Sequence, residues 1–229
     1  MIIAEMKKTQ NDADISGKIC FVIYTQGCSF QCDYCFHKDL REINEGSVGE
    51  KEALIAIESH KDKIKWLCIT GGEPTLQHNL LEFIKKVKDL GVSVKLETTG
   101  INSKAIHDLL EKKLLDYICM DIKNTWERYE KIIGVLDQEI VESCKSSLNI
   151  IQKSNVDHEF RTTVVPGVHT DEDLVSIAGY LQKGEKYCIQ NIRSCSDFLY
   201  SKYSEGPNYL HALVEKLHFA YPELSIYER

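Results

Sequence analysis

The stretch "KICFVIYTQGCSFQCDYC" (residues 18–35) joins two patterns that together decide the fold. Its first half, residues 18–25, is a run of β-branched and aromatic residues that is typical of a β-strand. Its second half places Cys28, Cys32 and Cys35 in the spacing C-x3-C-x2-C. We therefore expect a strand that ends at a cysteine-rich loop.

The rest of the chain repeats this alternation of strand, polar loop and helix. Further strand patterns occur at residues 64–70, 92–100, 115–123, 158–167 and 186–192. Apolar residues at helical spacing predict helices at 50–60, 76–91, 102–112, 137–153 and 171–183. Six such units favour an α/β fold, a partial (β/α)6 barrel with a parallel sheet and helices outside it.

Composition narrows the class of protein. We expect a single domain over residues 1–229, with a core at about 18–195 and a short C-terminal extension at 196–229, because no linker-like stretch interrupts the pattern. The net charge of -7 argues against general binding to nucleic acid or to a membrane surface. No apolar run reaches the roughly 18 residues of a membrane-spanning helix. The first residues lack the apolar core of a signal peptide, and nine cysteines, an odd number, argue against a disulfide framework. These features predict a protein of the reducing cytoplasm.

Polar residues follow or end nearly every expected strand. Beyond the cysteine loop, the segments are "GGEPT" (71–75), "ETTG" (97–100), "DIK" (121–123), "RTT" (161–163) and "QN" (190–191). Parallel α/β proteins bind ligands at the carboxyl ends of their strands. We therefore expect these segments to form one site together with the cysteines.

Three thiols in one short loop indicate an incomplete set of metal ligands. Four thiolates would close a zinc site or saturate an iron–sulfur cluster. Three would leave one iron of a 4Fe–4S cluster open to a substrate or a cofactor. The alternative is a zinc site that His37 or another cysteine completes.

The motif "CSFQCDYC" with "GGEPT" resembles the radical S-adenosylmethionine superfamily. More narrowly, the chain is similar to activating proteins of anaerobic ribonucleoside-triphosphate reductase, within the glycyl-radical-enzyme activase group. The segments that carry this likeness are "KTQNDADISGKICFVIYTQGCSFQCDYC", "ITGGEPTLQ", "LLDYICMDIKNTWERYEKIIG" and "EFRTTVVPGVHTDEDL". The resemblance covers roughly residues 8–195, most of the chain.

The resemblance implies a 4Fe–4S cluster on Cys28, Cys32 and Cys35, with the open iron chelated by the methionyl group of S-adenosylmethionine. One electron would then yield methionine and a 5′-deoxyadenosyl radical. That radical would take a hydrogen atom from a glycine of the partner enzyme, the large subunit of anaerobic ribonucleotide reductase. A flavodoxin- or ferredoxin-type protein would supply the electron.

The resemblance also implies which residues contact the cofactor. Gly71 and Gly72 would let the backbone approach the methionyl amino group, and Glu73 would accept its hydrogen bonds. Tyr34 would pack near the adenine, or else act as a simple wedge that supports the loop. The remaining expected cofactor contacts are Glu97, Thr98, Asp121, Lys123, Arg161 and Gln190, with Asn191 beside the last.

Several of these positions have a plainer interpretation. "GGEPT" could be an ordinary strand–turn–helix junction, and Asp121 and Lys123 an ordinary ion pair. Arg161, in an otherwise apolar strand, needs an anionic partner, either the cofactor or a structural carboxylate. His158 and His169 are expected to be solvated or hydrogen-bonded rather than ligands.

The chain departs from the related activases at two motifs. Residues 97–100 read Glu-Thr-Thr-Gly where the group has Asp-Thr-Asn-Gly, so the longer Glu97 puts the implied monovalent cation site in question. "CFHKD" (35–39) replaces Cys-His-Asn-Pro, which indicates a different partner or electron donor.

Other interpretations stay open at this point. Cys188 and Cys195 could hold a second metal, whereas Cys20, Cys68, Cys119 and Cys144 fit core positions. The function could instead be radical chemistry on a small molecule, a peptide or a nucleotide. A non-enzymatic iron–sulfur or zinc module is the remaining alternative.

Overall fold

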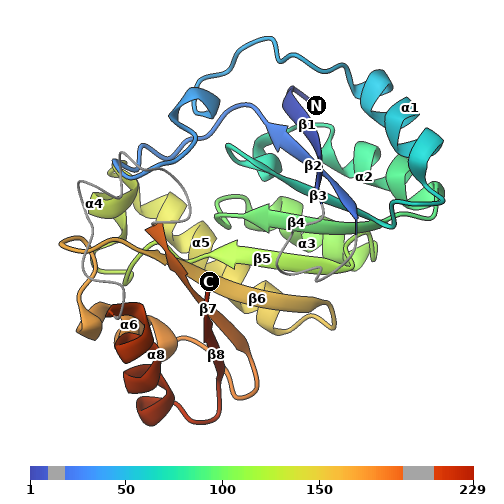
Figure 1. Ribbon diagram of the computed structural model, residues 1–229. Helices are drawn as coiled ribbons and strands as arrows, with labels where there is room; N and C mark the ends of the chain where they lie inside the picture. Colours follow the sequence, from blue (N-terminus) through green and yellow to red (C-terminus); the bar gives the residue numbers. More distant parts are fainter. Residues whose placement is uncertain (10–18, 193–208) are drawn as a thin grey trace. The chain divides into compact units, whose positions relative to one another are not determined.

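The computed structural model describes residues 1–9, 19–192 and 209–229 (Figure 1). The chain forms two compact units. Unit 1 comprises Met1–Ser29, His37–Cys119 and Ser143–Asp157, and unit 2 comprises Phe30–Phe36, Met120–Glu142 and His158–Arg229. The class is α/β, and the strand order of the sheet follows the sequence from β1 to β8. The single domain expected from the sequence stays a prediction.

Unit 1 is built on strands β1 to β4. Strand β1 (Ile3–Thr9) pairs antiparallel with β2 (Cys20–Thr25), and β2, β3 (Trp66–Gly71) and β4 (Ser93–Thr98) are mutually parallel. The elements that follow these strands are η2 (Lys38–Leu40), α1 (Glu50–His60), η3 (Pro74–Leu76), α2 (Leu80–Asp89) and α3 (Ser103–Glu111). Helix α2 packs on β4 and on α1.

Strands β2, β3 and β4 of unit 1 are largely buried on both faces, which explains their nearly continuous apolar sequences. Alternate residues form one apolar face, made of Phe21, Ile23, Leu67, Ile69, Val94 and Leu96. The opposite face holds a cluster of Cys20, Val22 and Cys68, against which Tyr24 and Trp66 pack. Toward the carboxyl ends of the strands this second face becomes more polar. Thr70 lies on it, in register with Tyr24. Lys95 lies beside Cys68 on the same face.

Unit 2 contains the parallel strands β6 (Asp157–Val164), β7 (Lys186–Asn191) and β8 (Ser225–Glu228). Its helices are α4 (Tyr129–Ile133), α6 (Asp171–Ala178) and α8 (Tyr209–Ala220). Strand β5 (Tyr117–Asp121) and helix α5 (Gln138–Gln152) contain residues of both units. A capping box between Thr170 and Asp173 begins α6.

The α/β class with a mostly parallel sheet and helices is confirmed, and the six expected strands and five expected helices are present. Within residues 1–9, 19–192 and 209–229, eight strands are present rather than six, because β1 and β8 come first and last in the strand order. Strand β1 was missed because its exposed side carries lysine and glutamate, as edge strands often do. Strand β8 has only 4 residues and α4 only 5, which is too short for a clear period.

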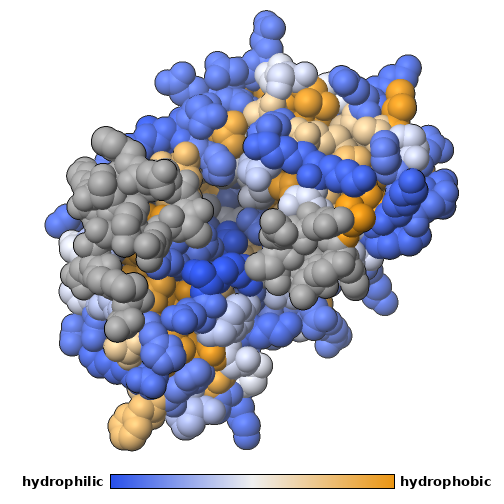
Figure 2. Space-filling view, in the orientation of Figure 1, coloured by the Kyte–Doolittle hydropathy of each residue, from blue (hydrophilic) through white to orange (hydrophobic). Residues whose placement is uncertain are grey.

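Hydrophilic residues make up most of the face drawn in Figure 2, with smaller hydrophobic areas between them. Among the described residues, no helix has the length and hydropathy needed to cross a membrane.

Candidate functional site

The "GGEPT" turn of unit 1 packs against the chain that leads into the cysteine loop. Gly72 N donates to Thr25 O at 2.9 Å, and Glu73 N donates to Gly27 O at 2.8 Å. A Cβ atom on Gly72 would lie 2.3 Å from Gly27 O, and one on Gly71 (φ +118°) would lie 2.3 Å from Thr25 N. Both glycines are therefore required for close packing of two backbones, which is a role that the sequence did not predict.

Glu73 is fully buried, and its carboxylate accepts five hydrogen bonds from neutral donors. Thr75 donates through its backbone N (3.0 Å) and its hydroxyl (2.6 Å). Thr98 donates through its hydroxyl (2.7 Å), and Thr99 through its N (2.7 Å) and hydroxyl (2.6 Å). Since a carboxylate offers about four lone-pair positions, these donors occupy its acceptor capacity. Glu73 thus ties the turn at residues 73–75 to the end of β4.

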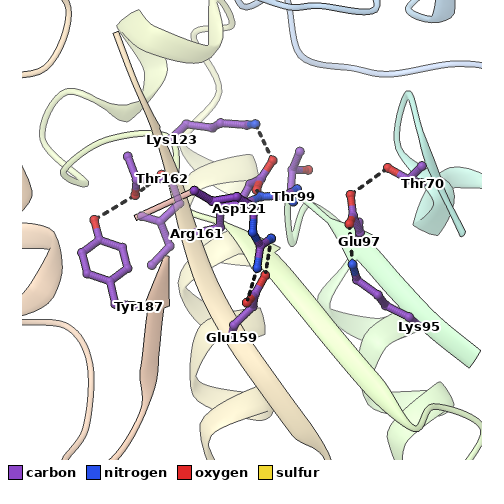
Figure 3. A network of polar contacts seen from close by, with 12 residues as sticks. Thr70, Lys95, Glu97, Thr99, Asp121, Lys123, Glu159, Arg161, Thr162 and Tyr187 are labelled. Atoms are coloured by element: carbon purple, nitrogen blue, oxygen red, sulfur yellow. Dashed lines mark hydrogen bonds and ion pairs between the residues drawn. The ribbon is translucent and has the colours of Figure 1, made fainter. Parts of the chain in front are cut away.

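Glu97, at the end of β4, is paired with a buried lysine. Lys95 Nζ lies 2.8 Å from Glu97 Oε1, and Thr70 Oγ1 donates to Glu97 Oε2 at 3.1 Å (Figure 3). The Lys95 side chain is 1% exposed and that of Glu97 is 18% exposed. A charge buried this deeply needs such a partner, so the pair neutralises itself within unit 1.

The cysteines fall in both units, with Cys28 in unit 1 and Cys32 and Cys35 in unit 2. In unit 2 the loop is held by α4, because Gln31 N donates to Ile133 O at 2.7 Å. Cys35 N donates to Cys32 O at 3.1 Å, so the two cysteines share a tight turn. Burial raises the pKa of the Cys32 thiol to about 11, although Lys123 acts to lower it.

Tyr34 lies inside unit 2, with 5% of its surface exposed. Its ring meets the His169 ring edge-on at 6.1 Å between centroids. Among the residues that the structure describes, its hydroxyl has no hydrogen-bond partner. Burial raises the pKa of Tyr34, and the proximity of the Cys32 sulfur adds to the rise. A buried hydroxyl of this kind is costly unless a further group accepts its hydrogen bond.

Asp121 lies between two cations of unit 2 (Figure 3). Lys123 Nζ lies 2.8 Å from Asp121 Oδ2, and Arg161 Nε lies 2.6 Å from Oδ1. Burial acts to raise the pKa of Asp121, but Arg161 and Lys123 outweigh it and hold that pKa below its ordinary value. The partner that Arg161 needs is therefore supplied at least in part by a structural carboxylate, which is one of the two alternatives that the sequence left open.

Three further expected positions have less to show. Gln190 lies at the end of β7, and Thr98 donates to Glu73 as described. Cys188 is fully buried in β7, as a core cysteine would be. Cys195 lies outside the described residues, so a second metal site with Cys188 stays a prediction.

The donors present fit a thiolate-bound cluster. Thiolates are the ligands that iron–sulfur clusters require. Lys123 acts to lower the pKa of the Cys32 thiol against the larger effect of burial, and the buried Tyr34 hydroxyl has no acceptor among the described residues. The role of Cys28, Cys32 and Cys35 as cluster ligands stays a prediction.

A family model described as the radical SAM superfamily matches residues 22–181. The chain belongs to this superfamily. It is therefore a radical SAM enzyme, and the superfamily implies a 4Fe–4S cluster and S-adenosylmethionine as its cofactors.

Two relatives share most of the length of this radical SAM chain. A protein of Methanocaldococcus jannaschii, whose name assigns it to the glycyl-radical-enzyme activating enzymes, is 32% identical over 181 residues, which are 77% of this chain and 74% of the relative. The pyruvate formate-lyase-activating enzyme of Streptococcus mutans is 27% identical over 191 residues, 77% of this chain and 72% of the relative.

Among solved structures, SuiB of Streptococcus suis bound to its precursor peptide SuiA is similar in fold, with a TM-score of 0.71 and 14% identity. The match covers 91% of this chain but 48% of SuiB, so the chain spans about half the length of that neighbour. The likeness confirms the radical SAM fold class.

The sequence did not point to Lys95, and it named His169 without predicting the bond to Lys123. Lys95 could have been found by the argument applied to Arg161, since both are charged residues within apolar strands. His169 was expected to be solvated or hydrogen-bonded, and it is hydrogen-bonded and buried. No local pattern predicts its bond to Lys123 O, because Lys123 lies 46 positions away.

Proposed function

We propose that this radical SAM enzyme is a glycyl-radical-enzyme activase, with the large subunit of an anaerobic ribonucleotide reductase as its partner. The similarity to the Methanocaldococcus jannaschii relative, 32% identity over 77% of this chain, carries the activase proposal. The likeness of residues 114–134 and 159–174 to reductase-activating proteins supports the finer choice of partner.

The cofactors supply the chemistry and the chain supplies the surroundings. When held by Cys28, Cys32 and Cys35, the cluster would supply one electron for the reductive cleavage of the sulfur–C5′ bond of S-adenosylmethionine into methionine and an adenosyl radical, and this chemistry would move a hydrogen atom from a glycine Cα of the partner to give 5′-deoxyadenosine and a glycyl radical. A flavodoxin- or ferredoxin-type protein is the proposed source of that electron.

Cys28, Cys32 and Cys35 are the proposed cluster ligands. Within unit 2, Lys123 favours the thiolate of Cys32, and it is also the proposed partner of the cofactor's carboxylate. Asp121 holds the Lys123 ammonium at 2.8 Å and so fixes where that positive charge lies. Arg161, Tyr34 and Gln190 stay proposed cofactor contacts.

Within unit 1, the turn residues act on the cofactor mainly through the backbone. Gly71 and Gly72 bring residues 71–73 against Thr25 and Gly27, next to Cys28. The Glu73 carboxylate already has five donors, so we propose that it shapes the turn and the Thr98–Thr99 backbone rather than relying on the cofactor for a partner.

A monovalent cation at Glu97 is not part of the proposal. The Lys95 ammonium lies 2.8 Å from Glu97 and already provides a positive charge there. A carboxylate that has paired with a buried ammonium attracts a second cation less strongly.

The test uses anaerobically reconstituted full-length protein with S-adenosylmethionine and a chemical reductant. We expect 5′-deoxyadenosine and methionine in equal amounts, and the glycyl-radical doublet in electron paramagnetic resonance spectra when an anaerobic ribonucleotide reductase large subunit is added. A Cys32→Ala variant is the control and should produce neither signal.

Two results would overturn parts of the proposal. If pyruvate formate-lyase, but not the reductase, gains the doublet, the partner is wrong and the activase assignment stands. If cofactor cleavage is robust while no glycyl-radical enzyme gains a signal, and deuterium from a small molecule or peptide enters 5′-deoxyadenosine, the activase assignment is wrong.

A further inference from the structure

The backbone at Ile122 and Lys123 leaves the strand, yet all four of its polar groups are paired within unit 2. Ile122 N donates to Arg161 O at 2.8 Å, and Ile122 O accepts from Thr162 Oγ1 at 2.9 Å. Lys123 N donates to the Tyr129 hydroxyl at 3.5 Å, and Lys123 O accepts from His169 Nε2 at 2.7 Å. Because three of these four partners are side chains, the position of Lys123 depends on them rather than on a β-ladder.

Two of these three side chains also meet the cysteine loop, since Tyr129 packs edge-on against Phe30 and His169 packs edge-on against Tyr34, next to Cys35. His169 is 3% exposed. Its Nδ1 accepts from Val165 N at 3.1 Å, which requires that Nδ1 carry no proton. Its Nε2–H is then the donor to Lys123 O. The neutral Nε2–H tautomer satisfies both bonds, and the ring edge packs against Tyr34.

We propose that His169 is a positioning residue that fixes Lys123 and Tyr34 beside Cys32. The shortest side-chain bond to the Lys123 backbone comes from this imidazole, and the same ring limits the space of Tyr34. The importance of this position for cofactor binding rests on the proposed function, in which Lys123 and Tyr34 contact S-adenosylmethionine.

Two substitutions separate the two bonds of the imidazole. Gln reaches the level of Nε2 and can still donate to Lys123 O, but it gives up the bond from Val165 N. Asn has its amide oxygen at the level of Nδ1, so it keeps the bond from Val165 N and loses the donor to Lys123 O. Both side chains are neutral and amide-bearing, so His169→Gln and His169→Asn form a matched pair.

The proposal predicts a difference between these variants in the Michaelis constant for S-adenosylmethionine. We expect His169→Asn to raise KM about tenfold, which corresponds to about 1.4 kcal/mol. The KM of His169→Gln should lie within about twofold of the native value, because this side chain can still donate to Lys123 O. Circular dichroism and iron content should match the native protein in both. Equal KM values in the two variants, whether raised or unchanged, would overturn the proposal.

A second readout needs no cofactor. Long-range proton–nitrogen NMR spectra of the cluster-free full-length protein should show His169 as the neutral Nε2–H tautomer at pH 6.5, where an ordinary imidazole is half protonated. A His169 signal of the Nδ1–H tautomer, or titration at the ordinary pKa, would contradict the geometry. If the native protein shows this tautomer but never cleaves S-adenosylmethionine, the proposed function fails while the geometry of His169 stands.

Discussion

Glu73 in unit 1 is fully buried and Asp121 in unit 2 is 17% exposed, and both carboxylates lie near the carboxyl end of a strand, but they are stabilised in opposite ways. Glu73 is surrounded by five neutral N–H and O–H donors. Asp121 is paired with two cations, Lys123 and Arg161. The first arrangement fixes backbone around an acceptor, whereas the second fixes the position of positive charge.

The two arrangements leave different groups available to a ligand. The neutral donors around Glu73 all donate to its carboxylate, so this side chain fixes the shape of the turn. A charged pair such as Asp121 and Lys123 instead keeps an ammonium ordered and ready for an anion. The two kinds of carboxylate should therefore respond differently to substitution, to salt and to pH.

The largest expected effect is that of Glu73→Ala. Two buried backbone N–H groups, those of Thr75 and Thr99, would lose their acceptor, at about 1 to 3 kcal/mol each. We expect the free energy of unfolding by urea to fall by at least about 3 kcal/mol, with little dependence on salt. Thr99→Val, which leaves the Thr99 N–H bond in place, is the control and should cost about 1 kcal/mol. A Glu73→Ala protein within 1 kcal/mol of the native protein would contradict this interpretation.

A smaller loss is expected for Asp121→Asn, which keeps the size of the side chain and removes its charge. Lys123 and Arg161 would lose an anionic partner while their side chains stay only 15% and 13% exposed. We expect a cost of about 2 kcal/mol at low salt. This cost should shrink as salt screens the ion pairs, unlike that of Glu73→Ala.

Urea unfolding of the native protein and of Asp121→Asn at acid pH tests the direction of the Asp121 pKa shift. The pKa of Asp121 is held below its ordinary value, so its contribution to stability is complete above the unfolded pKa and is lost as pH falls through the folded one. The native protein and Asp121→Asn should therefore approach each other in stability only below about pH 4. Convergence at neutral pH would mean that the ion pairs contribute nothing.

The sequence predicted the residues of this comparison and, as one alternative, the ion pair of Asp121 and Lys123, but not the donors around Glu73. Glu73, Asp121 and Lys123 are visible from the sequence because a polar residue directly after or at the end of a buried strand is unusual. What surrounds Glu73 could not be predicted, since Thr98 and Thr99 lie 25 and 26 positions away. The roles of Gly71 and Gly72 were also missed, because a glycine in a turn does not reveal which backbone it will meet.

The strands show the same limit at the level of the fold. Strands β2 to β7 were predictable because each is a short apolar run flanked by turn residues or helices. Strand β8 is stabilised by tertiary contacts that cannot be predicted from the sequence of its four residues. Buried Glu159, for example, accepts from the Tyr227 hydroxyl and pairs with Arg229 at 3.4 Å, across 70 positions of sequence.

The smallest effect is expected for His169, whose neutral imidazole donates to Lys123 O. Burial lowers its pKa from the ordinary 6.5, while its bonds to Lys123 and Val165 and the Asp173 carboxylate act to raise it and Arg128 to lower it. Because the unfolded chain binds this proton more readily than the folded one, stability should rise with pH up to the unfolded pKa and fall as pH drops from about 6.5 through the folded pKa. His169→Gln cannot titrate, so the difference in unfolding free energy between the native protein and this variant should decrease in that window. Urea unfolding at pH values from 7.5 to 5 would measure it, with His107→Gln, an exposed histidine, as the matched control. A difference that stays constant over this range would show that the imidazole is not held neutral by its surroundings.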